Sequence, residues 1–219
     1  SQVSPELLER DPRNVWLARG PRFRAEAEVV RDIALSVSGL ISHKLGGPSV
    51  IPPVPQNVLD YNYTYPSYWK PAEGPDRYRR TLYTMFYRSA PYPLLTTFDA
   101  PEFSTVCTRR SRSNTPLQAL AVANDPMFVE LAQKLAVRVL QDATSEPDTA
   151  HRVHRMFRLC LIRNPTDAEQ QLLIDFWNRQ VGLYTSDAES AKRLVSGDLK
   201  DFAPAEAAAW VSLARLLFN

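Results

Sequence analysis

The chain has 219 residues, of which 44% are hydrophobic and 23% charged; this is the composition of an ordinary globular protein and excludes a disordered one. Its 26 basic and 24 acidic residues give a formal net charge of only +2, so no overall field favours binding to nucleic acid. No apolar run approaches the roughly 20 residues of a membrane helix, and we therefore expect neither a nucleic-acid partner nor a membrane span.

The first 45 residues predict a strap followed by a helix. Residues 1–21 hold a short apolar group, Val15, Trp16 and Leu17, between polar residues and prolines, as expected of a strap that packs on a larger body. Residues 22–45 predict a helix, because apolar residues recur at spacings of three and four: Phe23, Ala27, Val30, Ala34, Val37 and Ile41. Gly46 and Gly47 are expected to end it, since glycine readily adopts the positive φ of a helix C-cap.

Residues 46–80 predict a long loop that is rich in proline and tyrosine. Seven prolines fall between residues 48 and 75, and this composition disfavours both a helix and a central strand. Five aromatic residues accompany them: Tyr61, Tyr63, Tyr65, Tyr68 and Trp69. Exposed aromatics could stack on sugar rings, but we favour the interpretation that they pack on the domain, because the loop has no other core.

Residues 81–126 predict a strand, a loop and a helix start. Aromatic and β-branched residues alternate from Leu82 to Arg88, which favours a strand or hairpin over 81–88. Prolines at 91, 93 and 101 then predict an irregular loop over 89–113. Thr115 is a good N-cap, with Pro116 at the first helical position and Gln118 at N3, so a helix with a capping box should begin at Pro116.

Residues 127–219 predict a helical C-terminal part. The helix starts are expected at Asp125 with Pro126, near the ATSEPD connection for the next helix, at Thr166 with Glu169, and at Pro204. The expected inward-facing residues include Leu131, Leu135, Val153, Phe157, Leu172, Leu173, Trp177, Trp210 and Leu213. The predicted fold is therefore mainly α: one domain over residues 1–219, with about six helices, a minor strand or hairpin and the long loop.

Three arginines lie just upstream of the helix start at Pro116. Arg109, Arg110 and Arg112 precede Thr115 by six residues or fewer, and a helix start offers outward-pointing N–H groups. These groups together predict an anion-binding loop that contains Thr115. The alternative is a structural clasp, in which the arginines pair with Asp99 and Glu102.

Two other groups of residues were considered as catalytic or metal sites. Asp99 and Glu102 are candidate catalytic carboxylates, but an irregular loop gives them no fixed separation for acid and base roles. His151 and His154 are three residues apart and could ligate a metal, yet no HExxH motif accompanies them, so we expect surface histidines and no metal site. Cys107 and Cys160 belong to no C-x-x-C-H motif, so this chain should carry no covalent haem and no other cofactor.

The sequence resembles a known family of multidomain proteins. The run RSRSNTPLQALAVANDPMFVE carries the resemblance most specifically, with RFRAEAEVVRDIALSVSGLI, GGPSVIPPVP, FRLCLIRNPTDAE and AAAWVSLARLLFN in the same order. It is similar to the C-terminal domain of large planctomycete and verrucomicrobial proteins in which a c-type cytochrome domain precedes two domains of unknown function. The resemblance implies an exported domain of the periplasm or cell envelope. Its partners would be the other domains of one precursor, including the cytochrome domain that carries haem.

Export affects two further expectations. The signal peptide would lie upstream of Ser1 in a longer precursor, because no such pattern begins this sequence. In an oxidising compartment Cys107 and Cys160 could form a disulfide, while the alternative is two buried apolar thiols; the sequence leaves both open.

Two functional classes follow from these residues. The first is a non-haem accessory or binding module with an anion-binding loop. The second is part of an enzyme acting on an anionic polysaccharide, in which the arginines hold a sulfate or a uronic carboxylate. The enzyme hypothesis requires Asp99 or Glu102 to line the same concave surface as the arginines, whereas the binding module does not.

Overall fold

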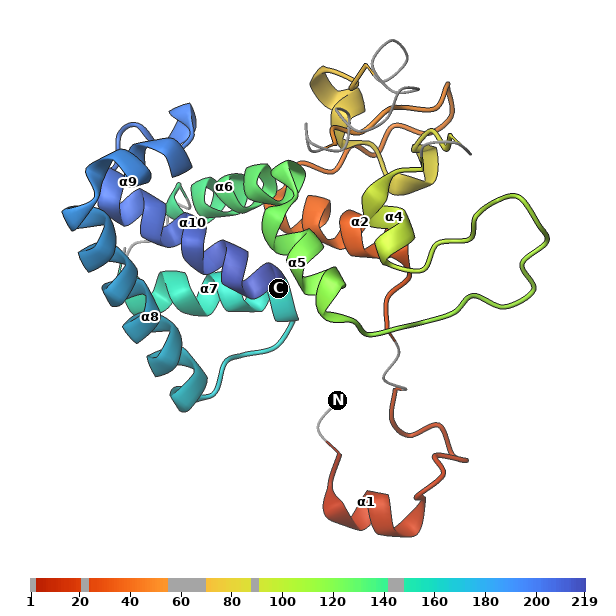
Figure 1. Cartoon of the computed structure of the whole chain (residues 1–219). Helices are drawn as coiled ribbons and strands as arrows, with labels where there is room; N and C mark the ends of the chain where they lie inside the picture. Colours follow the sequence, from red (N-terminus) through yellow and green to blue (C-terminus); the bar gives the residue numbers. More distant parts are fainter. Residues whose placement is uncertain (1–2, 21–23, 55–69, 88–90, 142–147) are drawn as a thin grey trace.

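The computed structural model describes residues 3–20, 24–54, 70–87, 91–141 and 148–219. The described residues are mainly helical, as predicted, with nine α-helices and three short 3-10 helices (Figure 1). The α-helices are α1 (Pro5–Arg10), α2 (Ala27–Ser38), α4 (Pro93–Thr97), α5 (Pro116–Asn124), α6 (Pro126–Leu140), α7 (Thr149–Leu161), α8 (Asp167–Ser186), α9 (Ala188–Leu194) and α10 (Pro204–Phe218). The 3-10 helices are η1 (Gly74–Tyr78), η2 (Thr81–Tyr83) and η3 (Gly197–Leu199).

Two hydrophobic clusters meet along α6. Its first two turns place Met127, Phe128 and Leu131 in a cluster with residues of α2, α4 and α5. Its later turns place Leu135 and Val139 in a second cluster with α7, α8 and α10. Figure 1 accordingly shows α7 to α10 on one side of α6 and α2, α4 and α5 on the other. The buried face of α6 therefore packs against both clusters and joins them into one domain.

Most helix starts lie where the sequence predicts them. α5 begins at Pro116, α6 at Pro126 and α10 at Pro204. The Asp125 carboxylate accepts a hydrogen bond from the Met127 N–H (2.7 Å), which confirms it as the N-cap of α6. The Thr166 and Glu169 capping box of α8 is also formed. These signals are local, so they survive in any tertiary context.

Several predicted elements are wrong in detail. The helix predicted over 22–45 ends at Ser38, because Gly39 adopts a φ of +81° and its N–H bonds back to the Leu35 and Ser36 carbonyls. The loop predicted over 89–113 contains α4, which begins at a proline. Leu172, expected inside, is 63% exposed. The strap does not cover its apolar group, since Trp16 is 61% and Leu17 83% exposed. The aromatic residues of the long loop lie outside the described residues.

The strand predicted over 81–88 is not formed in its described part. Residues Thr81–Tyr83 form η2 instead, and Thr84 makes one isolated parallel bridge with Val50. The reason is tertiary: Asp32 on α2 accepts the Thr81 N–H (2.6 Å) and so binds the backbone that a strand partner would need. A single strand is not stable without a neighbouring strand to pair with, so residues 81–87 do not form one.

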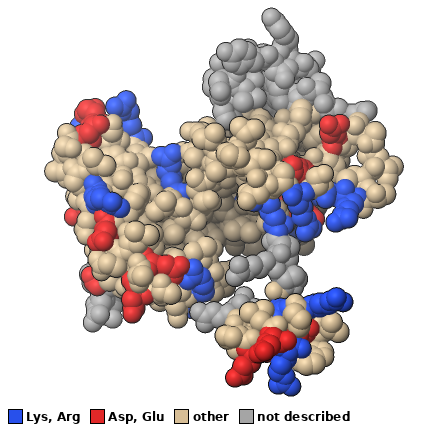
Figure 2. Space-filling view, turned by 60° about the horizontal axis from the view of Figure 1, so that its bottom comes forward, with Lys and Arg blue, Asp and Glu red and all other residues tan. Residues whose placement is uncertain are grey.

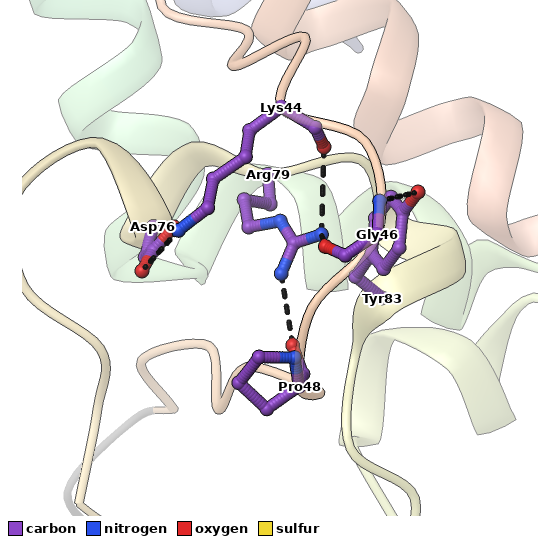
Figure 3. A network of polar contacts seen from close by, with 6 residues as sticks. All are labelled: Lys44, Gly46, Pro48, Asp76, Arg79 and Tyr83. Carbon is purple, nitrogen blue, oxygen red and sulfur yellow. Dashed lines mark hydrogen bonds and ion pairs between the residues drawn. The ribbon is translucent and has the colours of Figure 1, made fainter.

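Two buried arginines satisfy the backbone of these irregular segments. Arg31 on α2 is 1% exposed and donates to the carbonyl oxygens of Arg77 (2.9 Å) and Arg79 (2.8 Å). Arg79 is fully buried and donates in turn to the carbonyls of Lys44, Gly46 and Pro48 (Figure 3). The two guanidinium groups thus provide the hydrogen-bond donors that a β-ladder would otherwise provide to buried backbone oxygens.

The loop from Lys44 to Pro48 is wrapped around Arg79. The guanidinium carbon lies 3.7 Å from the centre of the Tyr83 ring, and the Tyr83 hydroxyl accepts the Gly46 N–H at 3.0 Å. Gly46 and Gly47 have φ values of +70° and +85°, so these glycines form the turn around the arginine rather than end a helix. A planar, forked donor is required at this position, because several carbonyls converge on it.

Replacing this fork tests the role of the network. Arg79→Lys should lower the free energy of unfolding by about 3 kcal/mol, because one ammonium cannot reach all the carbonyls and stays buried without them. Chemical denaturation measures the change. Arg80→Lys is the matched control: its side chain is 51% exposed and pairs with Asp32, so the loss should stay below about 1 kcal/mol. Equal losses in the two variants would contradict the proposed network.

The Asp125 cap makes the stability depend on pH. Burial raises the pKa of its carboxyl from 3.8 to about 6, even though Met127 donates to it. The folded protein then binds a proton more tightly than the unfolded chain, so this group's stabilisation is greatest below pH 3.8 and is lost as the pH rises to about 6.

Asp125→Asn should remove that dependence, since asparagine caps a helix equally well and does not titrate. The free energy of unfolding of the variant minus that of the native chain should rise by on the order of 2–3 kcal/mol between pH 4 and pH 7. Urea titrations at both values measure it. A difference that does not change with pH would show that the carboxyl is not perturbed.

Candidate anion-binding site

The segment between α4 and α5 projects from the body as a long loop that carries the candidate residues (Figure 1). Its two ends are tied together by Asp99, whose Oδ2 accepts the Ser113 N–H (2.6 Å) and the Ser113 hydroxyl (2.7 Å). These two donors hold the pKa of the Asp99 carboxyl below its ordinary value. Asp99 has a φ of +61°, which aspartate tolerates better than most residues.

Gln118 fixes the base of the loop to the body. It is 1% exposed, and its Nε2 donates to the Thr97 carbonyl (3.0 Å) and to the Ser113 hydroxyl (3.1 Å). Its Oε1 accepts from the Thr115 N–H (3.4 Å), which is one half of the predicted capping box, and from Arg24. The other half is also present, so the capping box predicted for Thr115 and Gln118 is confirmed.

Two of the three arginines are paired with the first turn of α2. Arg110 bonds to Glu28 (2.7 Å) and to Glu26 (3.2 Å), and Arg112 bonds to Glu26 (3.4 Å). The hydrogen bond to Glu28 is the main cause that raises the pKa of Arg110 above its ordinary value. A clasp of the predicted kind exists, but its carboxylates are Glu26 and Glu28 rather than Asp99 and Glu102. Because these pairs are partly exposed, they position the arginines more than they stabilise the fold.

An open cavity of about 890 Å³, with a concave surface, lies along this part of the loop. It is lined by Glu26, Cys107, Thr108, Arg109, Arg110, Ser111 and Arg112. Basic side chains gather on this side of the molecule (Figure 2). Arg109 is exposed and makes no ion pair with any described residue, so its guanidinium is available to a ligand. The surface offers three guanidinium groups and two hydroxyls, the donors that sulfate and carboxylate groups bind.

The two candidate catalytic carboxylates do not line this surface. Asp99 borders a separate crevice of about 10 Å³, which also contacts Arg110 and Arg112 and has room for about one water molecule. Glu102 is exposed and borders neither cavity. Thr115 also lies outside both linings, so the first turn of α5 does not face the arginine surface.

Both cysteines are free, so the structure does not form the Cys107–Cys160 disulfide, one of the two alternatives that the sequence left open. Cys107 is exposed and lines the concave surface. Cys160 packs against the core of α7 and α8, and burial raises the pKa of its thiol to about 12. Cys160 thus fits the alternative expectation of an apolar thiol, and Cys107 does not.

Metal and membrane features can be assessed for the described residues. His151 and His154 lie on α7, where they line a shallow depression without a carboxylate. No group of three or more histidine, cysteine or acidic side chains is placed to hold a metal ion in the described part of the chain. None of the described helices has the length and apolar character needed to cross a membrane.

The sequence did not identify the residues that position the arginines. Glu26 and Glu28 were not singled out as site residues, although two acids at a helix start are a usual signal for a cationic partner. Gln118 was identified only as a member of a local capping box. Its bonds to Thr97 and Arg24 join segments far apart in the sequence, and no local pattern reveals them.

Comparison with known proteins gives one family. A family model described as PSD1, a protein of unknown function (DUF1553), matches residues 1–177. Neither a curated protein nor a solved structure matches the chain.

The tie made by Asp99 can be tested against its neighbour Glu102. Asp99→Ala removes an acceptor for two donors and should lower the free energy of unfolding by about 1 kcal/mol. Amide hydrogen exchange in residues 100–112 should become faster, because the loop ends separate. Glu102→Ala should leave both quantities unchanged. Unchanged exchange in the Asp99 variant would mean that the loop is held by other contacts.

Proposed function

Because the chain belongs to the PSD1 family of proteins of unknown function (DUF1553), we propose that it is a non-haem binding module whose loop between α4 and α5 recognises anionic groups. The proposal rests on the ion pairs of the three arginines. Two are held in place by Glu26 and Glu28, and the third, Arg109, makes no ion pair among the described residues. A ligand would meet a surface that is already ordered and still has a free cation.

The chemistry of the surface favours an oxyanion on a larger molecule. Guanidinium groups bind sulfate and carboxylate through two parallel N–H donors, and the Thr108 and Ser111 hydroxyls add donors beside them. The surface is open and wide rather than enclosed, as suits one group presented by a chain. The proposed ligand is therefore a sulfated or uronic acid-containing polysaccharide.

The setting of the module follows from its resemblance to cytochrome-containing multidomain proteins. We place it in the periplasm or cell envelope, beside a c-type cytochrome domain that carries the haem. In that position the module would hold an anionic glycan near the other domains of the same precursor. The charge of the glycan supplies the contact, and the module itself performs no redox step.

The alternative enzyme function has less support from the geometry. In the described residues, the Asp99 carboxylate is engaged with Ser113 and borders only the small crevice, while Glu102 lies outside both linings. An acid and a base must reach the same reacting bond, and the one carboxylate in the lining of the arginine surface, Glu26, is paired with Arg110 and Arg112.

Binding to immobilised glycans tests the proposal. The chain should be retained by a sulfated or polyuronic glycan at low salt, should elute as salt rises, and should not be retained by neutral dextran. Arg109→Ala should weaken binding about tenfold, the loss of one charge-assisted contact.

Arg163→Ala is the matched control, because that arginine is exposed but lies on another surface, where it pairs with Glu169. The proposal fails if dextran is retained equally, or if the control weakens binding as much as Arg109→Ala does.

A further inference from the structure

The outer face of α7 is rich in basic side chains. The segment from Thr149 to Arg163 contains two histidines and four arginines and no acidic residue; Asp148 caps its start, and Arg163 pairs with Glu169 on α8. Exposed helix faces in soluble proteins usually mix both signs, because opposite charges three or four residues apart stabilise the helix. A face with an excess of one sign is instead typical of a surface that meets a partner of opposite charge.

The basic residues form a row on the side of α7 that is opposite the core. Val153, Met156 and Phe157 are buried, and a rotation of 100° per residue places His151 and Arg158 opposite them. A depression of about 290 Å³ lies on this side, lined by His151, His154, Arg155, Arg158 and Leu159. Arg158 forms no ion pair with any described residue. Arg158 therefore carries a positive charge that no ion pair with a described residue neutralises.

An exposed apolar corner continues the row at the end of α7. Leu161 is 46% exposed, and Ile162, the C-cap residue, is 91% exposed with a φ of +55°. Glycine or asparagine usually occupies such a position, because a β-branched side chain is strained there. The strain and the exposure have no explanation in the packing of the chain itself. A side chain kept under strain and in solvent suggests a contact with another molecule.

We propose that the outer face of α7 docks an acidic segment of a protein partner. Its carboxylates would lie along the row of His151, His154 and Arg158, and an apolar side chain of the segment would cover Leu161 and Ile162. From residue 151 to residue 162 the helix rises about 16 Å, the length of about five extended residues.

A protein segment explains both halves of this surface, whereas a small anion explains only one. A sulfate or phosphate would use the depression and leave the strained isoleucine without a role. The surface is also separate from the proposed glycan site, which is built on the loop between α4 and α5 and on α2. The two proposals therefore stand or fall independently.

Synthetic peptides provide the test. The probe is a fluorescently labelled ten-residue peptide with four glutamates followed by two leucines, and its binding to the whole chain is followed by anisotropy. Two control peptides carry glutamine for glutamate or serine for leucine. The acidic peptide with leucines should bind, and each control should bind at least several-fold more weakly.

Two variants separate binding from folding. Arg158→Glu should weaken binding of the acidic peptide tenfold or more without changing Tm. Ile162→Asn should weaken binding several-fold and raise Tm, because asparagine relieves the backbone strain while it removes the apolar contact. A purely structural role for Ile162 would not move the two quantities in opposite directions.

Two matched controls locate the effect. Arg179→Glu reverses an exposed charge on α8, and Arg109→Ala changes the loop; both should leave peptide binding unchanged. The inference is overturned if the acidic peptide does not bind or if the serine peptide binds equally well, which would indicate a simple anion site. It is also overturned if Arg179→Glu weakens binding as much as Arg158→Glu, or if Ile162→Asn leaves binding unchanged.

Discussion

Two buried guanidinium groups hold the irregular part of this fold against its helices. Arg31 and Arg79 donate to carbonyl oxygens in segments 77–79 and 44–48, neither of which belongs to a β-ladder in the described part of the chain. A backbone oxygen buried without a donor would be strongly destabilising, so these arginines allow segments outside any sheet to pack against α2. Lysine could not replace them, because the geometry requires a planar fork.

The same helix also positions the candidate site. Arg31 and Asp32 in the middle of α2 fix the segment around Thr81, and Glu26 and Glu28 at its start fix Arg110 and Arg112. The arginine surface is thus ordered by an element whose own position depends on buried contacts. This order lowers the entropy lost on binding, and it also means that a ligand competes with Glu26 for two of the arginines.

Local signals predicted helix starts well, and tertiary contacts account for most of the errors. Thr166 with Glu169, and Asp125 with Pro126, place donors and acceptors within four residues of each other, so the sequence alone reveals them. The strand at 81–88 was wrong because Asp32 captures the Thr81 N–H across 49 positions in the chain. In the same way, Glu26 and Arg110 are 84 positions apart, and no spacing rule connects them. The site's residue types were predictable, but their partners were not.

The formal net charge of +2 does not show which acidic and basic side chains are paired within the fold. Glu26, Glu28, Asp32, Asp99 and Glu130 all accept internal hydrogen bonds, so many carboxylates serve the fold. Arg109 and Arg158, in contrast, make no ion pair with a described residue. Arginines without an internal partner can therefore form local cationic patches that the net charge does not reveal. Near-neutral net charge then excludes a general attraction to polyanions, but it does not exclude local recognition, because screening limits each patch to partners within about 8–10 Å.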